Sequence, residues 1–306
     1  MLAKLSKKNI YAILGIFVTL ICLIFLYSFA KETSSSLRSI PKDIQFKPLV
    51  YSFLLFCLAT FVAAYLWLRI ASELGIRVKA LIHLKIYLTT LAARRLPGSV
   101  LHVVGRGAMY YNLGISPALT TFASGVEIAL ILWSGVLVLL VSLVSLVRIN
   151  QSQVLILLLL FAILSILIHP STLKFIIQKL IKSKEVPKIR YASLLTWLVG
   201  YVGLWFLGGL ILFCLLNSIY PTSALNFFVI LAAWSGGGVS GMLVVILPSG
   251  LGLTELTMSL ILGQFIPPSV AVVTALLARV LLTGFDFLIS LGSLAIWKAT
   301  NPKGLL

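Results

Sequence analysis

Long stretches without a single charged residue are the feature that most constrains the fold of this chain. Residues 10–30, 49–68 and 192–216 each form such a stretch. About 20 apolar residues in a helix cross the hydrocarbon core of a bilayer, where lipid offers the backbone no hydrogen-bond partners. Of the 306 residues, 60% are hydrophobic and only 10% are charged, against about 25% charged in ordinary soluble domains. The chain is therefore predicted to be an all-α integral membrane protein.

The apolar pattern predicts a polytopic helical bundle that forms one transmembrane domain over residues 1–306. Two regions, residues 76–112 and 224–267, are apolar but interrupted by glycine and proline. Irregular backbone at membrane depth is tolerated only inside protein or beside a cavity, so both are predicted to be broken or re-entrant helices. Continuous spans are expected at residues 10–30, 49–71, 117–147, 153–169, 191–217 and 269–297. The positions expected to form loops or hinges are Pro97, Gly105, Gly237, Pro248, Gly250 and Gly252.

The segment between the fourth and fifth predicted spans is basic and has one apolar face. This pattern is typical of an amphipathic helix at the membrane interface. An ordinary basic loop is the alternative. The apolar positions that recur at helical spacing are Leu173, Ile176, Ile177, Leu180 and Ile181.

The net charge of +17 indicates membrane topology rather than nucleic-acid binding, because the basic residues are unevenly distributed. The side richer in Lys and Arg is normally the cytoplasmic one. We therefore expect a multi-pass protein of the cell membrane with both termini in the cytoplasm and no nucleic-acid partner. Seventeen of the 24 Lys and Arg residues fall on this side, in segments 4–8, 69–95, 174–190 and 298–303. Five fall on the other side: Lys31, Arg38, Lys42, Lys47 and Arg148.

The two broken regions resemble each other, which suggests an internal repeat of residues 76–147 and 227–297. Each contains a Leu-Pro pair, at Pro97 and Pro248, and a proline also stands about 20 residues further on in both, at Pro117 and Pro268. A long apolar helix comes next in each region. In the predicted topology these two helices run in opposite directions, so the repeat is expected to be inverted, as in many secondary transporters. Chance similarity within an apolar sequence is the alternative.

Five charged residues fall in or beside the apolar segments. A charge at the bilayer centre costs roughly 2.5–3.5 kcal/mol on insertion scales, so these side chains must face the protein interior. One interpretation is a set of structural ion pairs that hold the helices in register. The other is a polar path for a charged headgroup or for protons. The five candidate substrate-binding residues are Arg106, Glu127, Glu255, Arg279 and Asp286.

Glu127 and Arg279 occupy equivalent positions in the predicted repeat. At a rise of 1.5 Å per residue, each lies about 15 Å along its helix from the membrane surface. That depth is close to the midplane of a hydrocarbon core about 30 Å thick. Their opposite charges can pair across a pseudo-two-fold axis or contact one headgroup in turn, and the sequence does not decide between these alternatives.

Two segments carry a family resemblance. The first runs from Leu-Pro-Gly at residues 96–98 through Gly105-Arg106 to the span with Glu127. The second is Pro-Ser-Gly-Leu-Gly-Leu-Thr-Glu at residues 248–255, in which a serine stands where the first glycine of the family pattern is usual. Together they resemble the flippase-like transmembrane domain of the lysylphosphatidylglycerol synthase family, over nearly the whole chain.

This resemblance implies a stand-alone member that lacks the synthase domain. In the two-part members, the membrane domain moves an aminoacylated phospholipid between leaflets, and a soluble domain makes that lipid. The implied function here is translocation of a phospholipid or lipid-linked intermediate through an internal polar cavity. The expected partners are membrane lipids, which include anionic or aminoacylated phospholipids and lipid-linked sugars.

Other functions remain open from the sequence. A non-transporting scaffold for a partner enzyme of lipid or glycan synthesis is the main alternative, and transport of ions or small solutes is another. Catalysis is the least favoured. The seven acidic residues include no Asp-x-Asp pair, and no serine, histidine and acid stand in a recognisable order. We expect neither enzyme activity nor a cofactor, and the three histidines lack metal-binding spacing.

Overall fold

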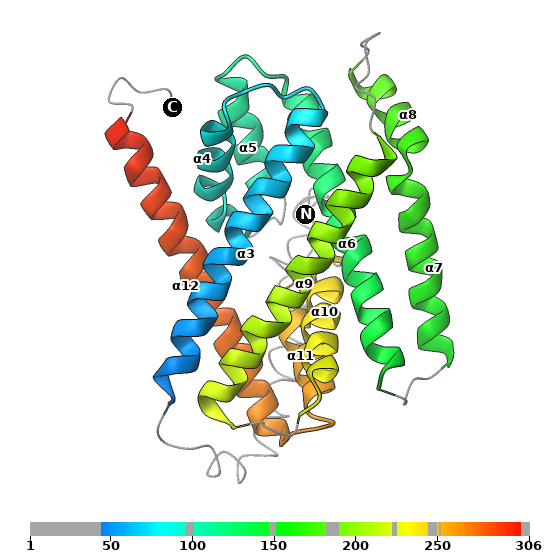
Figure 1. Cartoon of the computed structure of the whole chain (residues 1–306), viewed down its shortest axis with the longest axis vertical. Coiled ribbons are helices and arrows are strands. Elements are labelled where there is room, and N and C mark those ends of the chain that lie inside the picture. The colour runs from blue at the N-terminus through cyan, green and yellow to red at the C-terminus, as the bar shows by residue number, and fades with distance from the viewer. Residues whose placement is uncertain are drawn as a thin grey trace, which may run out of the picture.

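The computed structural model describes residues 44–95, 101–146, 151–181, 190–221, 225–243, 250 and 252–300. Every regular element in this part of the chain is a helix (Figure 1). In chain order the elements are α3 (Phe46–Glu73), α4 (Ala80–Thr89), η1 (Ala92–Arg95), α5 (Leu101–Tyr111), α6 (Pro117–Val144), α7 (Gln151–Ile168), α8 (Pro170–Ile181), α9 (Tyr191–Ile219), α10 (Phe227–Leu243), α11 (Leu253–Leu262) and α12 (Pro268–Thr300).

Four of the described helices, α3, α6, α9 and α12, are long and apolar enough to cross a membrane. Parts of α7 and α8 add a fifth crossing if they form one span with a bend of 58°. The chain is therefore a multi-pass helical membrane protein. The span predicted at residues 10–30 lies outside the described residues. The helices predicted at residues 49–71, 117–147, 153–169, 191–217 and 269–297 are confirmed to within three residues at the ends that the structure describes.

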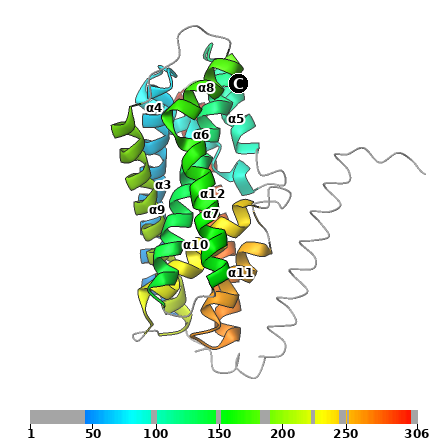
Figure 2. The same ribbon diagram turned by 90° about the vertical axis from the view of Figure 1, so that its right-hand side faces the viewer.

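The short helices gather in two groups at opposite ends of the bundle. α4, η1 and α5 lie in the upper half of Figure 1, and α10 and α11 lie in the lower half, a separation that Figure 2 also shows. The first predicted broken region thus contains α4, η1 and α5, and the second contains α10 and α11. The long helix α6 follows the first group and runs downward, whereas α12 follows the second group and runs upward (Figure 1).

Two of the predicted hinge positions are wrong. Gly105 lies inside α5, and Gly237 lies inside α10, which continues without a break through its glycines. A glycine weakens a helix by about 1 kcal/mol relative to alanine, but packing outweighs that cost here. A Cβ atom at Gly237 would lie 2.9 Å from the carbonyl oxygen of Thr254. Glycine therefore allows α10 and α11 to approach each other closely, rather than breaking α10.

The turn before α11 contains two further hinge candidates. Gly250 and Gly252 have φ angles of 63° and 88°, which glycine adopts without strain. A Cβ atom at Gly250 would also lie 2.4 Å from the Cα atom of Gly241. Glycine is therefore required at this turn. The two remaining candidates, Pro97 and Pro248, lie outside the described residues.

The amphipathic segment before α9 forms the helix α8. Leu173 is buried within it, and Lys174 and Lys179 are exposed. The prediction of a helix is confirmed, and the alternative of an irregular loop is excluded. α8 lies at the same end of the bundle as α4 and α5 (Figure 1).

Large aromatic side chains fill the interior of the bundle, and aliphatic side chains cover much of its outside. Trp67 on α3 and Trp197 on α9 are fully buried in one cluster. On α12, by contrast, the exposed fractions of Val280 and Leu288 are 68% and 61%. Apolar patches of this kind mark surfaces that lipid or protein covers, so the outward face of α12 suits a membrane environment.

Candidate functional site

A cavity of about 480 Å³ lies inside the bundle and is lined by residues from both groups of short helices. Most of its lining is apolar and includes Phe56, Leu204 and Met258. Trp234 also lines the cavity and packs directly against Gly208. A larger residue does not fit there, because a Cβ atom at Gly208 would lie 1.9 Å from Nε1 of Trp234. Charged side chains also line the cavity: Arg94, Arg95, Arg106, Glu127, Glu255 and Arg279.

Arg106 and Glu127 form a buried ion pair between α5 and α6. Only 4% and 3% of their side chains are exposed. The Arg106 guanidinium also lies 4.4 Å from the ring centroids of both Trp67 and Tyr87, and its Nε donates a hydrogen bond to Oγ1 of Thr90 at 3.4 Å. Contacts with a carboxylate and two aromatic rings stabilise a desolvated cation. The protein therefore holds this arginine from several sides.

Glu255 and Arg279 form a second ion pair, between α11 and α12, and this pair is looser. Nη1 of Arg279 lies 3.4 Å from Oε1 of Glu255, which accepts no directed hydrogen bond. The other oxygen, Oε2, accepts a hydrogen bond of 2.7 Å from the backbone N–H of Gly252. Glu255 thus caps the N-terminus of α11, where the helix dipole favours a negative charge. Arg279 keeps 16% of its side chain exposed.

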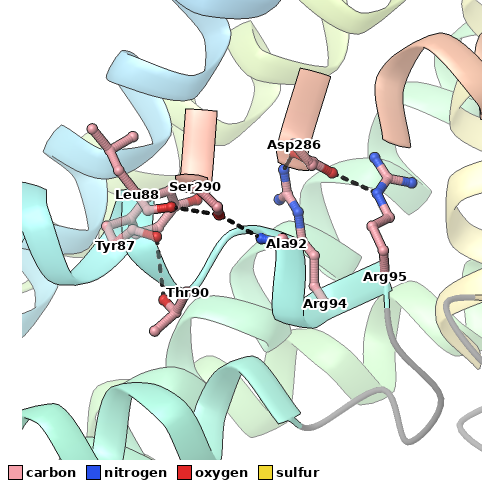
Figure 3. A network of polar contacts seen from close by, with 8 residues as sticks. All are labelled: Tyr87, Leu88, Thr90, Ala92, Arg94, Arg95, Asp286 and Ser290. Atoms are coloured by element: carbon pink, nitrogen blue, oxygen red, sulfur yellow. Dashed lines mark hydrogen bonds and ion pairs between the residues drawn. The ribbon is translucent and has the colours of Figure 1, made fainter. Parts of the chain in front are cut away.

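Asp286 on α12 is fully buried and holds the short helix η1 in place. Its two oxygens accept hydrogen bonds from Nη2 of Arg94 at 2.9 Å and from Nε of Arg95 at 2.5 Å (Figure 3). One turn further along α12, Oγ of Ser290 accepts a hydrogen bond of 2.8 Å from the backbone N–H of Ala92. These contacts join positions as far as 198 residues apart in sequence. They place two arginines on the cavity wall.

Arg94 and Arg95, which the sequence analysis assigned to the side rich in basic residues, turn inward onto Asp286. Their side chains keep 37% and 19% of their surface exposed. The signal in the sequence was their position directly before Leu-Pro-Gly of a broken apolar region. Their carboxylate partner is far along the chain, so local spacing does not reveal it.

Four of the five predicted site residues line the cavity. The fifth, Asp286, is not part of the lining but forms ion pairs with two arginines that are. The sequence left open whether Glu127 and Arg279 pair with each other. In the structure Glu127 pairs with Arg106, and Arg279 pairs with Glu255. No group of three or more His, Cys, Asp or Glu side chains in the described part of the chain is arranged to hold a metal ion.

Fold and site together define a multi-pass helical membrane protein with a charged internal cavity. No family model matches the chain, and no curated protein matches it in sequence. The resemblance to the lysylphosphatidylglycerol synthase family therefore rests on the two motifs quoted above.

Proposed function

We propose that this protein translocates a phospholipid or a lipid-linked intermediate between the two leaflets of the cell membrane. The observation that carries the proposal is a cavity with six charged side chains inside a bundle of membrane-crossing helices. Ionisable residues at membrane depth are costly and commonly mark the pathways of polar substrates. A lipid headgroup needs such a pathway, because the hydrocarbon core excludes it.

The size and the lining of the cavity suit a headgroup rather than a whole lipid. Small-molecule sites have volumes of about 300–1,000 Å³, and this cavity of about 480 Å³ falls in that range. Its apolar lining, with Phe56 and Met258, offers a surface for the carbons next to the headgroup. The remainder of the acyl chains can stay in the surrounding bilayer while the headgroup crosses through the protein.

The two ion pairs support a two-fold arrangement of the site. The short helix α5 carries Arg106 and the long helix α6 carries Glu127, whereas α11 carries Glu255 and α12 carries Arg279. Each half therefore places one charge on a short helix and the opposite charge on the long helix that follows, with the signs exchanged.

We further propose that residues 76–147 and 227–297 are inverted repeats, and that α4–α5 and α10–α11 are re-entrant hairpins from opposite membrane faces. Their positions in opposite halves of the bundle support this arrangement (Figure 1). Inverted repeats place substrates at the repeat interface near the midplane and allow alternating access. An antiparallel superposition of the two Cα traces tests the repeat directly.

The proposal includes an orientation and a family relationship. α4 and α8, which contain Lys85, Lys174 and Lys179, lie at one end of the bundle (Figure 1). The positive-inside rule makes this the cytoplasmic end, and it places both termini there. The flippase-like motifs support membership of the lysylphosphatidylglycerol synthase family. The proposed function is transport and not enzyme activity.

Reconstitution tests the proposed function. The full chain is incorporated into liposomes that contain a fluorescent phospholipid, and an impermeant quencher reports how quickly label crosses from the inner leaflet. We expect faster exchange than in protein-free liposomes and slower exchange with Arg279→Gln. The matched control is Arg69→Gln, which removes a half-exposed arginine that pairs with Glu73 outside the cavity. If the wild-type protein exchanges no class of lipid, translocation is wrong and the scaffold function is favoured.

A further inference from the structure

Among the described residues, the charges around the cavity are not balanced. An anion that enters a low-dielectric site with excess positive charge is stabilised, whereas a cation is repelled. Within the described part of the chain, the four arginines on the cavity wall outnumber the three carboxylates that contact them: Arg94, Arg95, Arg106 and Arg279 against Glu127, Glu255 and Asp286. The imbalance favours a ligand with negative charge.

Arg279 is placed to change partners. Its contact with Glu255 is 3.4 Å long and is not a directed hydrogen bond. If Arg279 moves away, Glu255 keeps its hydrogen bond from Gly252 and its favourable position at the N-terminus of α11. Arg106 differs, because Glu127 is buried and depends on it. Arg279 can therefore turn toward an incoming anion without leaving Glu255 wholly unsatisfied.

Arg95 supplies a second contact point on the opposite group of short helices. Asp286 accepts a hydrogen bond from its Nε, and a guanidinium carries five N–H donors. Among the contacts of the described residues, the terminal nitrogens of Arg95 take no part in a hydrogen bond, and the side chain lines the cavity. The positive charges of Arg94 and Arg279 also act on Arg95, so the three arginines share one electrostatic environment.

We propose that Arg279 and Arg95 together bind the phosphate of an anionic lipid headgroup, and that Glu255 is the resting counter-ion which Arg279 leaves when the phosphate arrives. This inference rests on the proposed function and narrows its substrate class. Guanidinium groups match phosphate oxygens in pairs, which favours two-point binding. Headgroups with an added positive charge, such as aminoacylated phospholipids, are disfavoured.

A binding experiment in a non-ionic detergent tests the ligand class without requiring transport. The probes are lysophosphatidate, lysophosphatidylcholine and inorganic phosphate, each titrated against the purified full chain. Lysophosphatidate should bind about tenfold to a hundredfold more tightly than lysophosphatidylcholine, which is the effect of one charged contact. Inorganic phosphate should bind more weakly than lysophosphatidate, because it gains nothing from the apolar walls.

Variants then test the two arginines. Arg279→Gln should lower the affinity for lysophosphatidate by about tenfold or more, and Arg95→Gln should lower it as well, whereas Arg69→Gln should not. A thermal unfolding curve for each variant identifies any loss of fold. Arg279→Lys, which keeps the charge but not the paired donors, should retain part of the affinity.

Two results would overturn the inference. One is equal affinity for lysophosphatidate and lysophosphatidylcholine, or an affinity that a folded Arg279→Gln variant leaves unchanged. The other is binding of inorganic phosphate as tight as that of lysophosphatidate, which would identify a free-phosphate site. In liposomes, exchange of zwitterionic or cationic lipids in preference to anionic ones would refute the substrate class alone. Absence of all lipid exchange would instead refute the proposed function.

Discussion

The ion pairs of the two halves differ in how tightly the protein holds them. In the first half, Arg106 contacts Glu127, two aromatic rings and a threonine, and both partners are almost fully buried. In the second half, Arg279 is partly exposed to the cavity and lies 3.4 Å from Glu255. Each half thus has an ion pair between a short helix and the long helix that follows it. The pair is tightly held in the first half and loosely held in the second.

This difference separates a structural role from a binding role. A buried pair stabilises only while both partners remain, because one partner alone is an uncompensated charge. The Arg106–Glu127 pair therefore belongs to the framework that joins α5 and α6. The carboxylate of Glu255 has a second interaction at the N-terminus of α11. We infer that the first half positions the cavity and that the second half responds to its occupant.

The largest effect on stability is expected from Arg106→Gln. It leaves the buried carboxylate of Glu127 without its cationic partner, which typically costs about 3–5 kcal/mol. Thermal or denaturant unfolding in detergent measures this loss. Arg69→Gln is the control and should change stability by no more than about 0.5 kcal/mol. A folded Arg106→Gln protein of wild-type stability would show that the pair is not part of the framework.

A second comparison uses the glycines of the two halves. Gly237→Ala should destabilise by about 1–3 kcal/mol, because the added methyl group meets the Thr254 carbonyl at 2.9 Å. Gly105→Ala should cost less, because its nearest neighbour is a side-chain methyl group of Thr90 at 3.3 Å. Gly125→Ala, with open space at its Cβ position, is the control and should stabilise α6 by about 0.5–1 kcal/mol. Equal unfolding midpoints for all three variants would contradict the packing of α10 on α11.

These glycines also show how far the sequence can predict this molecule. Long apolar stretches identified the membrane-crossing helices, because the length and the composition of a stretch are enough to recognise them. Gly237 was taken for a hinge, because propensity suggests a break where close packing in fact favours glycine. The carboxylates and arginines were recognised as buried from their cost in lipid. Contact between Glu255 and Arg279 was one of the expected alternatives, and the structure shows that pair. The contact of Arg94 with Asp286 was not foreseen, because it joins positions 192 residues apart.

A smaller loss of stability is expected from Arg279→Gln. Glu255 keeps its hydrogen bond from Gly252, so the cost should be about 1–2 kcal/mol, well below that of Arg106→Gln. The same unfolding experiment measures both variants side by side. If Arg279→Gln proves as destabilising as Arg106→Gln, both pairs are structural and the division of roles between the halves is wrong.

The smallest effect on stability is expected from Glu255→Gln. The side-chain amide oxygen can still accept the Gly252 N–H, so the loss should be about 1 kcal/mol or less. Removal of the negative charge should also leave Arg279 more available, so lysophosphatidate should bind more tightly than to the wild type. Titration of the purified variant checks this change. Weaker binding would contradict the role of Glu255 as a competing counter-ion.

The central claim is that a lipid headgroup crosses the membrane through the cavity, and a pair of tryptophan substitutions on α12 tests it most directly. Ala278 is buried and lines the cavity, whereas Leu276, two residues earlier, is 41% exposed on the outside of the helix. In liposomes with matched protein content and matched unfolding temperatures, Ala278→Trp should slow lipid exchange by about tenfold or more, since an indole in the cavity narrows the path of the headgroup. Leu276→Trp should exchange lipid at the wild-type rate. Equal exchange rates for the two folded variants would contradict transport through this cavity.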